Sequence, residues 1–283
     1  MKDAVGGNMT PGSGKRKPRG AQGAGESPLF GFLGILALLL LWEGAARMMG
    51  SALLLPGPLP VARRLIALAG TERFLRALGE SFFRVIRGIL ISVPLGVAAG
   101  IAAGIDRRVR AFLSPLFSVI AATPVMAVIL ILFLWLGPEQ TTVFSAFLMV
   151  FPVMAANTQE GVGRVDGGLR ELFRVYGLSP GETLRRLYIP SVMPFILGGL
   201  RSSLSLCWKV VVAAEVLVQP LRALGTGMQQ AKALFETGEL FAWTAATVAA
   251  AALSQALLSL ALSLYRRRDR GGRGLLRGRG EKR

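Results

Sequence analysis

The chain has 283 residues, of which 52% are hydrophobic, and 33 lysines and arginines against 16 aspartates and glutamates give a formal net charge of +17. A soluble domain of this length would need more polar surface, so the composition favours a membrane protein. The absence of histidine and the single Cys207 exclude disulfides and the usual zinc sites, and we expect neither metal nor cofactor.

The first 81 residues predict three different environments. Residues 1–28 are rich in glycine, proline and basic side chains, which is typical of a disordered cytoplasmic tail. Residues 29–49 form an apolar run long enough to cross about 30 Å of hydrocarbon as a first transmembrane helix. Within residues 50–81, prolines break the helix, and the amphipathic stretch that follows is expected to lie on the outer membrane surface as an extracytoplasmic segment.

Residues 82–264 contain five further apolar runs, at 82–105, 112–136, 141–156, 192–218 and 240–264. Together with the first helix they predict an all-α membrane protein, a polytopic bundle of six transmembrane helices. Gly96, Gly100 and Gly104 repeat every four residues, and small residues at this spacing let helix backbones approach closely in lipid. A polar loop at 157–190 interrupts the five-helix core, and a basic cytoplasmic tail, expected to be unstructured, follows at 265–283.

The positive charge follows the predicted topology. Of the lysines and arginines, 22 lie in the two tails, the 106–110 turn and the 160–190 loop, and 6 lie in the segments of the opposite side. Cytoplasmic segments of membrane proteins carry such an excess, so we expect a multi-pass cell-membrane protein with both termini in the cytoplasm. This distribution favours membrane topology over nucleic-acid binding as the reason for the net charge.

The segment ELFRVYGLSPGETLRRLYIP, residues 171–190, is the most distinctive part of the sequence. Gly177 permits a sharp bend between two short helices, because glycine accepts positive φ without penalty. Pro190 is expected to end the second short helix. Glu171 is expected near the start of the first, where a carboxylate favours the helix dipole.

The spacing of five loop residues resembles the "EAA" loop of ABC-transporter permeases: Glu171, Gly177, Leu187, Ile189 and Pro190. The resemblance spans about residues 55–264 and includes LPGP, SFFRVIRGILISVPLGVAAGI at 81–101 and WKVVVAAE at 208–215. It is similar to the nitrate, sulfonate and taurine (SsuC/TauC-like) branch of the binding-protein-dependent permeases. Leu172 and Phe173 replace the two alanines of the family's motif, which changes the expected contact.

What the resemblance implies is a MetI-like permease fold and import of a small solute through the inner membrane. In that family the loop couples to a separate ABC ATPase, the permease forms a homodimer, and an extracytoplasmic substrate-binding protein delivers the solute. The solute is expected to be a sulfonate-, nitrate- or taurine-like anion or a thiamine-precursor-like compound. The chain has no complete phosphate-binding loop, so we expect it not to be an enzyme, and ATP hydrolysis would belong to the partner.

Lys209 and Glu215 are the candidate translocation-path residues, because charges inside apolar runs usually face a cavity or a partner group. Six residues separate them, or about 240° around a helix, so they do not share a face. Pairing with neighbouring helices is the structural alternative for both. The alternative function is an ion-coupled secondary carrier not associated with an ATPase, which would require acidic groups at mid-membrane and matched broken helices.

Overall fold

The computed structural model describes residues 28–280, with side chains placed for residues 29–264. In this range the chain is helical and contains no strand. Five helices are long and apolar enough to cross a membrane. The predicted all-α membrane fold is therefore confirmed for the described residues, while the expected tail at residues 1–27 lies outside them.

The elements in chain order are α1 (Pro28–Met49), α2 (Pro58–Ala69), α3 (Glu72–Ile105), α4 (Arg107–Ala122), α5 (Val125–Gly163), α6 (Gly167–Val175), α7 (Pro180–Thr183), the π-helical turn η1 (Leu184–Tyr188), α8 (Ile189–Val218), α9 (Leu224–Ala233) and α10 (Thr237–Gly280).

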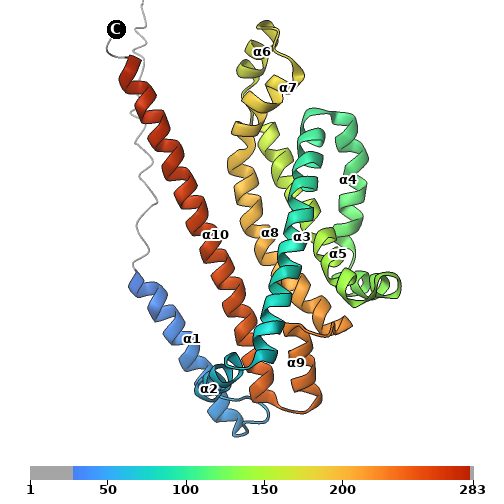
Figure 1. The fold of residues 1–283 in the computed structure, drawn as a ribbon, viewed down its shortest axis with the longest axis vertical. Helices are drawn as coiled ribbons and strands as arrows, with labels where there is room; N and C mark the ends of the chain where they lie inside the picture. Colours follow the sequence, from blue (N-terminus) through green and yellow to red (C-terminus); the bar gives the residue numbers. More distant parts are fainter. Residues whose placement is uncertain (1–27, 281–283) are drawn as a thin grey trace, which may run out of the picture.

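The long helices α1, α3, α8 and α10 run roughly along the longest axis of the molecule (Figure 1). The short helices α6 and α7 lie at one end, and α2 and α9 lie at the other. We call these the α6 end and the α9 end. The helices α3, α5 and α8 pack together, and α10 contacts α2, α8 and α9. Buried side chains from α3, α5, α8, α9 and α10 form the main apolar core.

The third predicted span, 112–136, is not one continuous helix. α4 ends at Ala122, and α5 begins after Pro124, whose extended backbone caps the new helix. α5 then continues through the outer turn expected at residues 137–140, with a kink at Gly137, where φ is 69° and ψ is 175°. A proline cannot supply the N–H that would continue α4, and glycine tolerates the positive φ of the kink. This pass is therefore made of two shorter helical pieces.

Two other element boundaries differ from those expected. The amphipathic stretch after the prolines is divided between α2 and the first turns of α3, because the Thr71 hydroxyl caps α3 by accepting a hydrogen bond from the Phe74 N–H at 3.2 Å. α10 continues to Gly280, into the segment predicted as an unstructured tail. No proline follows Leu264, so every residue of this segment keeps the backbone N–H that a helix requires.

The glycine repeat forms the contact between α3 and α5. A Cβ atom at Gly96 would lie 2.6 Å from the Met154 Cβ, and one at Gly100 would lie 2.5 Å from the Ala155 carbonyl oxygen. A Cβ atom at Gly104 would likewise lie 2.5 Å from the Val162 Cβ. These distances are shorter than real Cβ contacts, so the two backbones can approach this closely only where no side chain intervenes.

We predict that Gly100→Ala lowers the stability of the folded chain by about 1–3 kcal/mol, because the new methyl group overpacks the contact with Ala155. Gly79→Ala is the matched control, since Gly79 lies in the same helix and a methyl group added there would meet no atom within 4 Å. Unfolding in detergent measures both. Equal stability of the two variants would contradict the role assigned to the glycine contact.

Candidate functional site

The loop between α5 and α8 begins with a capped helix, α6. The Asp166 carboxylate accepts hydrogen bonds from the backbone N–H groups of Gly168 at 2.7 Å and Leu169 at 3.3 Å. This places negative charge at the positive end of the helix dipole. Glu171, expected near the start of this helix, lies in its middle and is exposed. That expectation was wrong, because Asp166 takes the capping position.

Gly177 makes the bend that the sequence predicts. Its φ is +64°, in the left-handed region, and its N–H donates to the Arg174 carbonyl at 3.0 Å. The Leu178 N–H donates to the Phe173 carbonyl at 3.2 Å. This pair of hydrogen bonds is the Schellman arrangement, which ends a helix and turns the chain sharply with a glycine in the left-handed position.

The second half of the loop continues directly into α8. Ser179 and Glu182 form a reciprocal capping box at the start of α7. α7, η1 and α8 then follow without interruption, and the span Pro180–Val218 behaves as one helix of 39 residues. Pro190, expected to end the second short helix, instead lies in the first turn of α8. The expectation was wrong because the wider π turn of η1, closed by the Ile189 N–H on the Leu184 carbonyl, accommodates the missing N–H and bulky ring.

Leu187 packs this loop against the helical bundle. It is 4% exposed and packs with Val162, Val165 and Val192 in a small apolar cluster. Phe173 and Ile196 cover the cluster partly, so α5, α6 and α8 all contribute. Of the five residues singled out in the loop, Leu187 is thus internal, whereas Glu171, Gly177, Ile189 and Pro190 are exposed.

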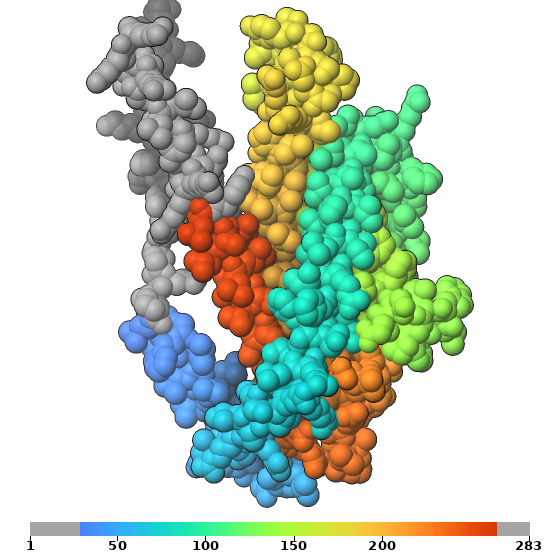
Figure 2. Space-filling view, viewed as in Figure 1, coloured from blue at the N-terminus to red at the C-terminus, as the bar shows by residue number. Residues whose placement is uncertain are grey.

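The loop presents apolar and basic side chains outward. Leu169 and Leu172 are 45% and 47% exposed, and Val175 and Tyr176 at the end of α6 are 78% and 73% exposed. The exposed arginines of the same loop are Arg170, Arg174, Arg185 and Arg186. Figure 2 shows this loop as a yellow protrusion beyond the ends of α3 and α4. An apolar stripe with basic flanks is suited to contact with another protein.

An ion network centred on a buried arginine lies toward the α9 end, and one of its two carboxylates, Glu139, is 46% exposed. Arg84 on α3 is 1% exposed, and its guanidinium donates to Glu139 on α5 at 2.6 Å and 2.9 Å. A third N–H reaches the Glu215 carboxylate on α8 at 3.0 Å. The same nitrogen donates to the Arg222 carbonyl at 2.9 Å. One arginine therefore joins three helices and the loop after α8.

The other oxygen of Glu215 connects the network to α9. It accepts from the Ser81 hydroxyl at 2.9 Å and from the Gly225 backbone N–H at 3.1 Å. Ser81 in turn accepts from the Leu224 N–H at 3.0 Å. The Gly225 N–H, in the first turn of α9, thus points at a carboxylate, which the helix dipole favours. A Cβ atom at Gly225 would lie 2.5 Å from the Glu215 Cβ, so glycine is required for this approach.

The two candidate translocation-path residues have different surroundings. Glu215 is 0% exposed, with every contact made inside the network, which corresponds to the structural alternative for this residue. Lys209 is exposed on α8, and no carboxylate of the described residues pairs with it. The two side chains do not share a face, in agreement with the expected helical separation. Lys209 is the one that is available to meet a solute or a second copy of the chain.

Arg84 and Glu139 as partners of Glu215, and Asp166 and Ser179 as helix caps, were not predicted from the sequence. The caps carry a local signal, since an aspartate or serine before a short helix, with a glutamate three residues later in the second case, is typical of a helix start. The sequence signal at Arg84 is weaker. A charge at the end of an apolar run needs a partner of opposite charge, but the sequence does not say which residue that partner is.

The sequence is similar to those of known transport proteins. The family model described as "binding-protein-dependent transport system inner membrane component" matches residues 92–271, which include the loop and α8. The taurine transport system permease protein of Escherichia coli K12 is 30% identical over 244 residues, covering 83% of this chain and 87% of that protein. A probable ABC transporter permease protein of Brucella melitensis is 32% identical over 191 residues, covering 67% and 77%. The formylaminopyrimidine transport permease protein of Halalkalibacterium halodurans is 30% identical over 183 residues, covering 64% and 71%.

The chain therefore belongs to the family of inner-membrane components of binding-protein-dependent transport systems. The resemblance of the sequence to the sulfonate and taurine branch of the ABC permeases is confirmed. The family is one of multi-pass transport permeases rather than enzymes. This membership favours the permease over the ion-coupled carrier that the sequence left as an alternative.

We predict that Arg84→Gln destabilises the folded chain by about 3–5 kcal/mol, because it leaves the Glu215 carboxylate buried without its counter-charge. Arg164→Gln is the matched control: it removes an exposed pair with Glu160, whose side chain is 58% exposed, and costs about 0–1 kcal/mol. Denaturation in mixed detergent micelles compares the two. An Arg84→Gln chain as stable as the control would show that the network is dispensable.

Proposed function

We propose that the chain is the membrane subunit of an ABC importer and that a separate ATPase docks on the loop 157–190. The observation that carries the proposal is the protruding α6–α7 surface, where exposed apolar side chains stand among four arginines. Leu172 lies at the centre of the apolar stripe, where the family's motif has an alanine, so the contact is more hydrophobic than the motif implies. Glu171, Ile189 and Pro190 are exposed and available to it.

The loop is continuous with the membrane-spanning helix α8, so it can transmit force to the bundle. The span Pro180–Val218 forms one helical rod, so a push on α7 moves α8 directly. Leu187 fixes the rod to the ends of α5 and α6, and the network at Glu215 fixes its far end to α3. Closure of an ATPase dimer would then tilt α8 as a rigid body and switch the bundle between two packings.

The orientation follows from the charge distribution. The arginine-bearing loop and the far end of α10 lie at the same end of the molecule (Figure 1). With this α6 end in the cytoplasm, both termini are cytoplasmic, and the α9 end faces outward. An extracytoplasmic substrate-binding protein would then deliver its solute at the α9 end of a homodimer in the inner membrane.

The solute we propose is a small anion of the sulfonate, nitrate or taurine class. Lys209 supports this, because an ammonium exposed on a membrane-spanning helix is costly unless it meets water, an anion or a partner group. In a homodimer two such lysines would line a common path. A thiamine-precursor-like compound is the second candidate, favoured by the similarity to the formylaminopyrimidine permease protein.

We predict that Gly177→Pro abolishes capture of the ATPase by the permease, because proline fixes φ near −65° where the chain needs +64°. The measurement is co-purification from nanodiscs with candidate ABC-type ATPases of the same organism. Gly167→Pro is the matched control: Gly167 is the first residue of α6, a position where proline is tolerated, and a side chain there meets no atom within 4 Å.

Two results would count against this proposal. Capture that survives Gly177→Pro would place the ATPase contact elsewhere on the chain. Absence of capture by the folded wild-type chain, with any ATPase of the ABC type, would remove the importer assignment.

We predict that Lys209→Gln lowers uptake of an anionic solute by about tenfold or more, which is the effect of losing one charge-assisted contact. Lys232→Gln, an exposed lysine on α9, should leave uptake unchanged. Uptake into proteoliposomes with the complete importer measures both. Retained anion uptake in Lys209→Gln would exclude this residue from the path.

A further inference from the structure

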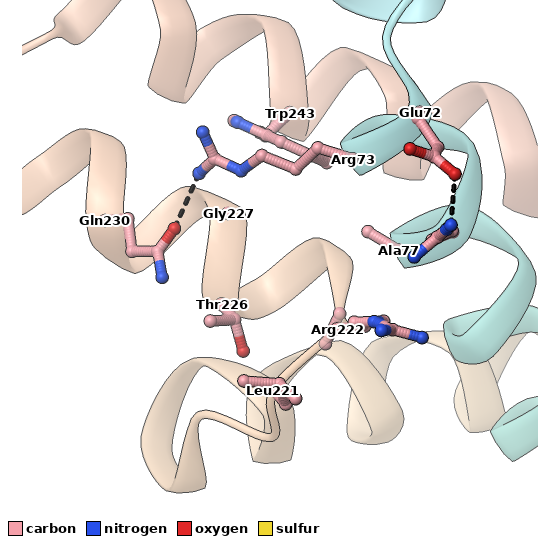
Figure 3. A pocket seen from close by; sticks show the side chains of 11 residues that line it. Glu72, Arg73, Ala77, Leu221, Arg222, Thr226, Gly227, Gln230 and Trp243 are labelled. Carbon is pink, nitrogen blue, oxygen red and sulfur yellow. Dashed lines mark hydrogen bonds and ion pairs between the residues drawn. The ribbon is translucent and has the colours of Figure 1, made fainter.

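A basic pocket of about 280 Å³ lies at the α9 end, separate from the loop and from Lys209. It is formed by the first turns of α3, the segment after α8, α9, and the start of α10 (Figure 3). Its volume is close to the lower end of the range of about 300–1,000 Å³ for small-molecule sites. The family match does not indicate a pocket at this position, and no residue of the loop 157–190 lines it.

The charge of the pocket is positive. Three arginines line it, Arg73, Arg76 and Arg222, against a single carboxylate, Glu72. Arg76 pairs with Glu72, and Arg73 lies 3.8 Å from Glu239, so these two are largely balanced. The Arg222 guanidinium is exposed and makes no ion pair with any described side chain. One full positive charge is therefore available to a ligand.

Besides the arginines, Gln230 offers the pocket hydrogen-bond donors. The Gln230 side-chain oxygen is occupied by Arg73 at 2.6 Å, which leaves its amide N–H groups for another acceptor. The Arg73 guanidinium stacks 5.7 Å from the centre of the buried Trp243 ring, which holds it in place. Figure 3 shows the Arg73 guanidinium beside Gln230 at one edge of the pocket and the Arg222 side chain at another edge, above Leu221. The Thr226 hydroxyl donates to the Pro220 carbonyl at 2.7 Å, so the segment after α8 is held in place beside the pocket.

The floor of the pocket is apolar. Ala77, Ala223 and Trp243 line this part of the pocket, and the exposed Leu221 lies beside it. A ligand that matches both parts has an oxyanion group for the arginine and amide donors and a short hydrocarbon part for the floor. Arginine presents parallel N–H groups that fit planar or tetrahedral oxyanions in two-point contact.

We propose that this pocket binds a small organic oxyanion, a sulfonate or a carboxylate, with Arg222 as its principal charged contact. The pocket is also joined to the membrane network, because the Arg222 carbonyl accepts from Arg84. A ligand here would therefore hold the segment after α8 against α3. The concave shape favours a small ligand over an acidic surface of another protein, and binding here does not depend on whether the chain transports the ligand.

The test is isothermal titration of the full chain in nanodiscs with methanesulfonate, acetate and inorganic sulfate, each at ionic strength held constant with chloride. The expected result is saturable binding of one organic anion per chain. Arg222→Gln should weaken it roughly tenfold or more, the loss that a charge-assisted contact carries. Arg63→Gln is the matched control, because Arg63 is an exposed arginine on α2 outside the pocket, and its loss should leave affinity unchanged.

Four outcomes would overturn the proposal. The first is the absence of saturable binding by methanesulfonate and by acetate. The second is unchanged affinity in Arg222→Gln, confirmed as folded by an unaltered unfolding midpoint. The third is an equal loss in Arg63→Gln, which would mean attraction by net charge alone. The fourth is loss of substrate-binding-protein capture in Arg222→Gln without anion binding by the wild type, which would assign the pocket to an acidic side chain of that protein.

Discussion

A buried guanidinium must find all of its partners inside the protein, because the hydrocarbon of a bilayer offers neither water nor counter-ions. Arg84 meets this requirement with two carboxylates and a backbone carbonyl, and in doing so it fixes the relative positions of α3, α5 and α8. The same face of α3 continues every four residues through Gly88, Ser92, Gly96, Gly100 and Gly104, all but the last buried. The ion network thus sets the register at one end of a contact that small residues complete along its length.

This arrangement gives α8 two different fixed points. At the α9 end, Glu215 is held by Arg84, Ser81 and the first turn of α9. At the α6 end, Leu187 is packed between α5 and α6. Between them the helix passes without a break through a π turn that accommodates Pro190. In the mechanism proposed above, a helix held at these two points and exposed at Lys209 between them would move as a unit.

The two ends of the molecule also differ in what they present. The α6 end has convex apolar and basic surface, which suits a broad protein contact. The α9 end has a concave basic pocket with an apolar floor, which suits a small ligand. The ion network joins the pocket to the membrane helices, because Arg84 donates a hydrogen bond to the Arg222 carbonyl. The continuous helix Pro180–Val218 connects this end of the molecule to the α6 end.

The membrane class, the helical character, the close glycine contact and the bend at Gly177 could be predicted from the sequence, because each depends on local composition, spacing or backbone preference. The number of spans could not: six were predicted, whereas five helices of the described residues are long and apolar enough to cross a membrane. It misplaced Glu171 and Pro190 within the loop, since helix starts depend on caps such as Asp166 whose competition is settled only by folding. The pairing of Glu215 with Arg84, 131 residues away, is visible only in the folded chain, as is the finding that Lys209 meets no carboxylate among the described residues. Partners so distant in the chain are chosen by helix packing, and no pattern along the sequence encodes which buried charge meets which.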